Sequence, residues 1–131
     1  MKKIIKVSCG ILYNNKNEIL ISQRSKNSKD YPLKWEFLGG KFEPGETGKQ
    51  AMIREIKEEI DLDISNPKLF HTKTHSEEYA DIYLEFYIIK EWTGKIKKLV
   101  HETLVWEKIE KLKDYDLLDG DLEIVKMLEN L

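Results

Sequence analysis

Three carboxylates at helical spacing, Glu55, Glu58 and Glu59, carry the clearest chemistry in this sequence. Residues three and four positions apart share one face of a helix, so we expect these side chains to converge. A like-charge pair at this spacing destabilises an isolated helix by about 0.2–0.5 kcal/mol. Two interpretations follow from the residues alone: a solvated acidic face, or a site for a hard divalent cation that prefers carboxylate oxygens.

The segment from Gly40 to Leu62 favours the cation site. It resembles the Nudix box, G-x5-E-x7-R-E-U-x-E-E-x-G-U with U apolar, and in particular the MutT-type branch of small nucleotide-hydrolysing Nudix proteins. The matching positions are Gly40, Glu46, Arg54, Glu55, Ile56, Glu58, Glu59 and Leu62. Asp61 stands where the family has Gly. Because Asp tolerates a left-handed turn better than most residues, we expect this departure to leave the metal-binding groups intact.

The resemblance implies a metal centre. Glu55, Glu58 and Glu59 are expected to ligate Mg²⁺ or Mn²⁺, with the backbone carbonyl of Gly39 as a further ligand. A further glutamate outside the box serves the family as a metal ligand or general base. We assign it to Glu102, with a box glutamate as the alternative base.

Two other box residues are expected to brace the loop against the helix. By resemblance, Arg54 grips loop carboxylates and Glu46 is its partner. The alternative for Glu46 is a favourable charge near the N-terminus of the helix, which requires no catalysis. The sequence contains 20 Lys and only two Arg, Arg24 and Arg54, which indicates that each Arg serves where a planar guanidinium is needed.

Four residues are candidates for contacting a nucleotide. Related proteins place a phosphate-contacting Arg where Arg24 stands, and Lys41 is a second phosphate candidate. Phe37 would either pack on a base or belong to the core. Asp121 matches a position where this branch carries an Asn or Asp that hydrogen-bonds the base, and the alternative is an N-cap of the following helix.

Hydrolysis of a nucleoside triphosphate to a monophosphate and pyrophosphate is the activity that the resemblance implies, with an oxidised guanine or a cytosine base. One alternative is a Nudix hydrolase of ADP-ribose or a dinucleoside polyphosphate. Another is a nucleotide-binding module without turnover, which is disfavoured because the box keeps all its glutamates.

These residues need a sheet and helices to position them. Strands are predicted at 4–13 and 18–23, joined by a hairpin turn at 14–17, then at 35–38, 68–75, 82–92 and 103–107. The clearest helix runs from Thr47 to Ile60, where Thr47 and Gln50 form a capping box and Met52, Ile53, Ile56 and Ile60 form the core-facing stripe. A second helix is predicted at 122–131. The predicted elements indicate an α/β domain with helices packed on the faces of a sheet. The resemblance implies a Nudix α/β/α sandwich with a mixed sheet, as a single domain over residues 1–131.

Composition sets the remaining limits. The 131 residues carry 22 basic and 24 acidic side chains, a net charge of −2, which argues against binding polymeric nucleic acid. No apolar run approaches the roughly 18 residues of a membrane span. We therefore expect a cytoplasmic protein. It is expected to be a monomer or homodimer, and the resemblance implies that its partner is a nucleotide.

Overall fold

The computed structural model describes residues 2–98 and 103–131. Its elements, in chain order, are β1 (Lys3–Leu12), β2 (Glu18–Gln23), β3 (Trp35–Glu36), β4 (Leu38–Lys41), α1 (Gly48–Ile60), β5 (Asp63–Ser65), β6 (Lys68–Ser76), β7 (Ala80–Ile89), β8 (Glu91–Thr93), β9 (Thr103–Lys108), the 3₁₀ helix η1 (Ile109–Asp114) and α2 (Asp119–Glu129).

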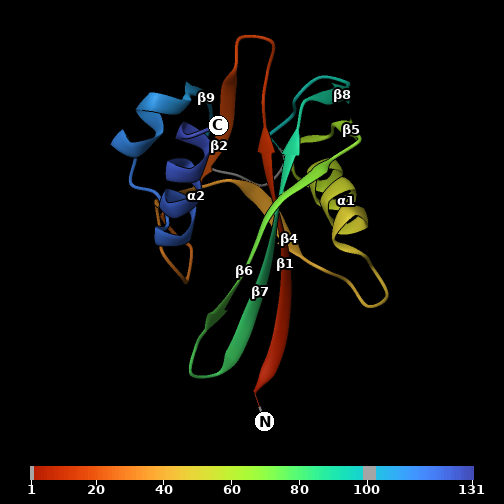
Figure 1. Ribbon diagram of the computed structural model, residues 1–131, viewed down its shortest axis with the longest axis vertical. Helices are drawn as coiled ribbons and strands as arrows, with labels where there is room; N and C mark the ends of the chain where they lie inside the picture. The colour runs from red at the N-terminus through yellow and green to blue at the C-terminus, as the bar shows by residue number, and fades with distance from the viewer. Residues whose placement is uncertain (1, 99–102) are drawn as a thin grey trace.

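A central sheet lies between the two α-helices (Figure 1). Its strand order is β4-β1-β7-β6, with β1 and β7 parallel and the other neighbours antiparallel, so the sheet is mixed. α1 and α2 cover opposite faces of this sheet (Figure 1). The expected α/β/α sandwich is therefore confirmed.

Each helix seals its own apolar core against one face of the sheet. Side chains of α2, such as Ile124 and Val125, pack on Cys9, Ile11 and Phe86. Side chains of α1 pack instead on the alternate residues of the same strands. Since successive side chains of a strand point to opposite faces, β1 and β7 contribute to both cores.

The hairpin turn predicted at 14–17 is present, because the Asn17 amide donates to the Asn14 carbonyl and the Asn14 amide donates to the Glu18 carbonyl, but little strand pairing follows it. A single bridge, Tyr13 to Ile19, joins β1 to β2, and the strands then separate into different sheets. β2 lies in a second sheet of order β3-β2-β9, and β5 pairs with β8 in a third. The strand predicted at 35–38 is divided at Phe37, where the chain passes from the second sheet into the central one.

The start and end of α1 agree with the sequence. Thr47 is the N-cap, and its capping box with Gln50 is formed in both directions. Asp61 ends the helix in a left-handed conformation, φ 60° and ψ 34°. The predicted core stripe is wrong at Ile53, which is 40% exposed, because the buried face of α1 is rotated toward Ala51 and Glu59.

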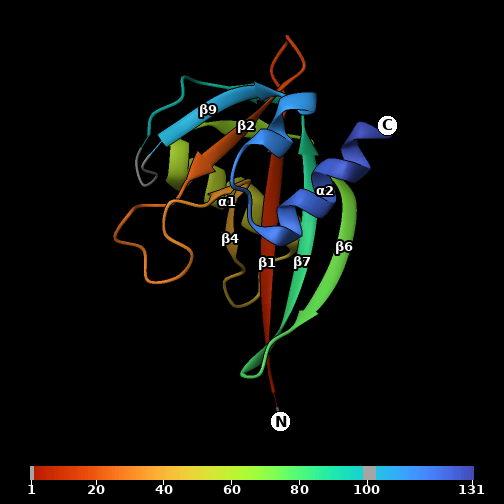
Figure 2. The same cartoon turned by 90° about the vertical axis from the view of Figure 1, so that its left-hand side faces the viewer.

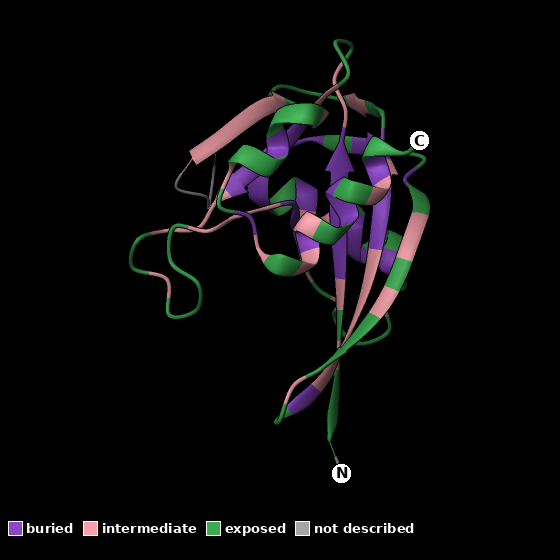
Figure 3. Cartoon of the chain, turned by 60° about the vertical axis from the view of Figure 1, so that its left-hand side comes forward, coloured by how far each residue is buried: buried purple, intermediate pink, exposed green. Residues whose placement is uncertain are grey.

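α2 begins at Asp119, three residues earlier than predicted. It lies across the upper part of β1, β7 and β6, and these strands continue past its N-terminal end (Figure 2). Figure 3 shows the result: the strands are buried near the helices and become more exposed toward their other ends. No helix among the described residues is long and apolar enough to cross a membrane.

Candidate metal and nucleotide site

Two glutamates of α1 meet the glycines of β4. The backbone N–H of Gly39 donates to the Glu59 carboxylate over 3.0 Å. A Cβ at Gly40 would collide with the Glu55 carboxylate, which therefore rests directly on the strand backbone. A Cβ at Gly39 would collide with the carbonyl of Ser8 on β1, and Gly39 has a φ of +153°. Both glycines are thus needed for the close approach of β4 to its neighbours.

Arg54 holds the loop before α1 to the acidic face of the helix. Its Nε and Nη2 donate to both oxygens of Glu46, over 2.7 and 2.9 Å, and Nη2 also donates to the Lys41 carbonyl. Its Nη1 donates to Glu55 over 2.9 Å and to Glu58 over 3.1 Å. The structure therefore brings together the four box residues that the resemblance assigns to this region.

The contacts and the burial of Glu46 and Glu55 shift the pKa values of these two side chains in opposite directions. Hydrogen bonds from Arg54 and from the Glu43 amide lower the pKa of Glu46, whereas burial raises the pKa of Glu55 despite its Arg54 contact. Sequence reasoning missed Glu43, which approaches Arg54 Nε at 2.9 Å. Its spacing of three residues from Glu46 is the signal that would have identified it.

The donor set fits a hard divalent cation. Glu55, Glu58, Glu59 and the Gly39 carbonyl offer oxygen ligands, the type preferred by Mg²⁺. Two of the carboxylates already lie against the glycine pair, while Glu58 is 57% exposed and is fixed by little besides Arg54. Across residues 2–98 and 103–131, no three acidic, His or Cys side chains form a preassembled metal cage.

Asp121 lies inside the protein, on the α2 side of the same segment. Its carboxylate accepts a hydrogen bond of 3.1 Å from the Phe37 amide, and the residue is only 8% exposed. Burial raises its pKa to about 7. The alternative of an N-cap is wrong, because Leu118 is the N-cap residue and Asp121 lies in the first turn. Phe37 itself is buried in the core that α2 seals.

Arg24 is already committed to protein contacts. Its Nε and Nη2 donate to the Glu36 carboxylate, over 2.9 and 3.3 Å, and Nη1 donates to the Asp30 carbonyl. The guanidinium thus holds the 25–34 loop to β3. Lys41, the other phosphate candidate, is exposed at the end of β4. Glu102, the predicted glutamate outside the box, lies outside the described residues.

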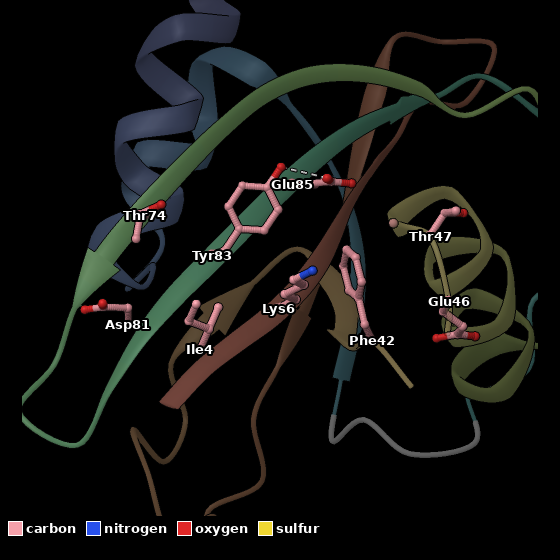
Figure 4. Close-up of a pocket in the computed structure, with 10 residues that line it drawn as sticks. Ile4, Lys6, Phe42, Glu46, Thr47, Thr74, Asp81, Tyr83 and Glu85 are labelled. Carbon is pink, nitrogen blue, oxygen red and sulfur yellow. Dashed lines mark hydrogen bonds between the residues drawn. The ribbon is translucent and has the colours of Figure 1, made fainter. Parts of the chain in front are cut away.

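A groove of about 610 Å³ lies on the α1 side of the central sheet, opposite the side of Asp121, at the N-terminal end of α1 (Figure 4). Its walls carry three carboxylates, Glu46, Asp81 and Glu85, against one cation, Lys6. The Glu85 carboxylate accepts hydrogen bonds from the hydroxyls of two tyrosines and lies against Gly48 in the first turn of α1. This acidic lining disfavours a polyphosphate.

The comparisons with known proteins agree with this geometry. The profile of the NUDIX domain family matches residues 3–131. The chain therefore belongs to the NUDIX domain family. Nudix hydrolases generally need divalent cations, which agrees with the oxygen donors around Gly39.

Curated relatives with similar sequences are nucleotide hydrolases. The chain is 35% identical over 95 residues to the 8-oxo-dGTP diphosphatase of Proteus vulgaris, covering 72% of this chain and 84% of the relative. It is 30% identical over 126 residues to the CTP pyrophosphohydrolase of Escherichia coli (strain K12), covering 95% and 90%. The solution structure of the E. coli ORF135 protein superposes with a TM-score of 0.87 at 28% identity, covering 99% of this chain and 91% of that one.

Proposed function

We propose that this protein hydrolyses a nucleoside triphosphate to a nucleoside monophosphate and pyrophosphate, using Mg²⁺. One observation supports this assignment above the others. The amides of Phe37 and Gly39, two residues apart, donate to Asp121 and Glu59 respectively. A short extended segment thereby joins a buried hydrogen-bonding group suited to a base edge and the carboxylates suited to a cation.

The roles follow from the contacts. Asp121, held in place by the Phe37 amide, would recognise the base. Glu55, Glu58, Glu59 and the Gly39 carbonyl would hold the cation, and Arg54 would fix Glu55 and the loop carboxylates around it. When bound, Mg²⁺ supplies charge neutralisation for the triphosphate and lowers the pKa of a water molecule.

The reaction itself is the attack of water on a phosphorus of the triphosphate. A new P–O bond forms between the water oxygen and that phosphorus, the bridging P–O bond between the α- and β-phosphates breaks, and a base accepts the proton of the water. Glu102 or a box glutamate is the proposed base. Arg24 and Lys41 are the proposed phosphate contacts, with Arg24 exchanging part of its Glu36 contact for the substrate.

The names of the relatives indicate which bases to test. One is a diphosphatase for 8-oxo-dGTP and another a pyrophosphohydrolase for CTP. We therefore propose an oxidised guanine or a cytosine nucleotide as the preferred substrate. Asp121 suits either, because both bases present N–H groups to a carboxylate.

A nucleotide panel with product identification tests the proposal. Purified protein is incubated with 8-oxo-dGTP, dGTP, CTP, dCTP, ATP, UTP, ADP-ribose and a dinucleoside tetraphosphate, with Mg²⁺ or with excess chelator. We expect a monophosphate and pyrophosphate from at least one triphosphate, and no turnover with chelator. Release of a diphosphate and inorganic phosphate, exclusive cleavage of ADP-ribose, or full turnover in chelator would overturn it.

A further inference from the structure

Beside Asp121, the central sheet presents a half-exposed apolar surface. On the α2 side, β1 contributes Ile5 and Val7, and β7 contributes their register partners Ile82 and Leu84. All four are intermediate in exposure, and Val7 and Leu84 pack against the core that α2 seals. Small-molecule sites combine apolar surface with a few placed polar groups. We call the apolar surface formed by these four residues the platform.

Lys73 lies at the edge of this platform. It is the register partner of Leu84 on the neighbouring strand β6, so its side chain rises on the same side of the sheet. Its ammonium group would be 3.4 Å from a Cβ added at Gly120, which precedes Asp121. The Lys73 side chain is 21% exposed. The cation and the buried carboxyl therefore flank one end of the platform.

A purely structural role explains the position of Lys73 poorly. Its ammonium pairs with Glu123 over 2.9 Å, but Glu123 is 59% exposed, and such pairs contribute little to stability. The ammonium also lies over the first turn of α2, where the helix dipole favours negative rather than positive charge. Burial dominates the raised pKa of Asp121, and the nearby Lys73 opposes it.

We propose that Lys73 is a specificity-determining residue that donates a hydrogen bond to a carbonyl oxygen on the edge of the base. The inference rests on the proposed function, since it requires the base to lie on the α2 side of the sheet. Lys73 supplies only donors, whereas ionised Asp121 supplies only acceptors. Together they match an edge that offers a carbonyl oxygen next to an N–H, as the O6 and N1–H of guanine do.

The matched substrates are dGTP and 6-thio-dGTP. Both have the N1–H whose hydrogen bond Asp121 would accept. They differ only in the atom at position 6, which is oxygen, a strong acceptor, in dGTP and sulfur, a weak acceptor, in 6-thio-dGTP. We measure kcat and KM separately for both nucleotides, together with the dissociation constants of dGMP and 6-thio-dGMP by calorimetry. The wild-type protein should prefer the oxygen compound about tenfold in kcat/KM, and the two monophosphates should differ similarly in affinity.

Two variants separate recognition from the salt bridge. Lys73→Met and Glu123→Gln break the same ion pair, but only Lys73→Met removes the proposed donor. Lys73→Met should reduce the oxygen preference to less than twofold, whereas Glu123→Gln should retain it.

Equal preferences in Lys73→Met and the wild type would overturn the inference, as would the loss of preference in both variants or its absence in the wild type. Hydrolysis of the panel with the correct products would still support the proposed function in these cases. A wild-type protein that cleaves no triphosphate refutes the proposed function and, with it, this inference.

Discussion

The backbone amide of Gly39 donates to the carboxylate of Glu59 over 3.0 Å, although the two residues belong to different elements. This contact fixes one proposed cation ligand against the edge strand of the central sheet. Glu59 is 6% exposed, so its carboxylate is largely withdrawn from water before any cation binds. The hydrogen bond offsets part of the cost of burying that charge.

Glu58→Gln separates chemistry from folding. Glu58 is exposed and its contact with Arg54 is a surface ion pair, worth at most about 1 kcal/mol. The substitution removes an anionic ligand, so turnover with Mg²⁺ should fall by about 100-fold or more while Tm changes little. Glu129→Gln, on the exposed end of α2, is the control and should retain full activity. If Glu58→Gln hydrolysed the substrate at the wild-type rate, Glu58 would be a solvated surface residue and not a cation ligand.

Gly40→Ala should disturb the cation site selectively. The added Cβ would collide with the Glu55 carboxylate, the far end of a flexible side chain that is able to move away. We expect a folded protein whose affinity for Mn²⁺, measured by calorimetry, is at least tenfold weaker. Gly120→Ala adds the same methyl group in α2 at ordinary contact distance and should leave Mn²⁺ affinity unchanged. Equal Mn²⁺ affinity in both variants would show that Glu55 is not held where the glycine places it.

The end of α1 offers a test of backbone strain. Asp61 adopts φ 60°, where glycine is favoured, and its carboxylate pairs with Lys57 and Lys97. Asp61→Gly and Asp61→Ala both remove the carboxylate, but only alanine keeps a Cβ in the left-handed region. Asp61→Gly should therefore be more stable than Asp61→Ala by about 1 kcal/mol in the free energy of unfolding. Urea denaturation measures the difference, and equal midpoints would contradict a left-handed helix end.

The pKa of Asp121 makes a prediction about pH. Burial raises this pKa from 3.8 to about 7, so the folded protein keeps a proton that the unfolded chain releases in that interval. The contribution of Asp121 to stability is therefore fully present at pH below its unfolded pKa and is lost as the pH rises toward 7. Asp121→Asn has no such titration and still offers an acceptor to the Phe37 amide. The wild-type Tm should fall relative to that of Asp121→Asn between about pH 4 and 7, and a constant difference would contradict the raised pKa.

Sequence patterns predicted the structural features that depend on residues close together in the chain, such as the start and the end of α1. The capping box at Thr47 fixed the start of α1, and the position of Asp61 marked its end. The predicted core-facing stripe of α1 was wrong at Ile53. Helical spacing shows which residues share a face, but it does not show which neighbouring elements that face contacts. Helical spacing also placed Glu59 on the same face as Glu55 and Glu58, and it did not predict that Glu59 is only 6% exposed.

Tertiary contacts account for what the sequence did not predict. The amide of Phe37 and the carboxylate of Asp121 are 84 residues apart, and no local pattern marks them as partners. Lys73 is one of 20 lysines, and only its register opposite Leu84 distinguishes it. The separation of β1 and β2 likewise depends on which strands compete for their edges, here β7 and β9.

The two faces of the central sheet carry different groups of candidate functional residues, which bears on how base preference could change. Residues that would choose the base lie on the α2 side, and those that would perform the chemistry lie on the α1 side, joined by the segment 37–39. Substitutions at positions such as 73 or 121 leave the core packed by α1 untouched. Under the proposed function, a substitution on the α2 side would change the base preference while the side chains on the α1 side that would perform hydrolysis stay as they are.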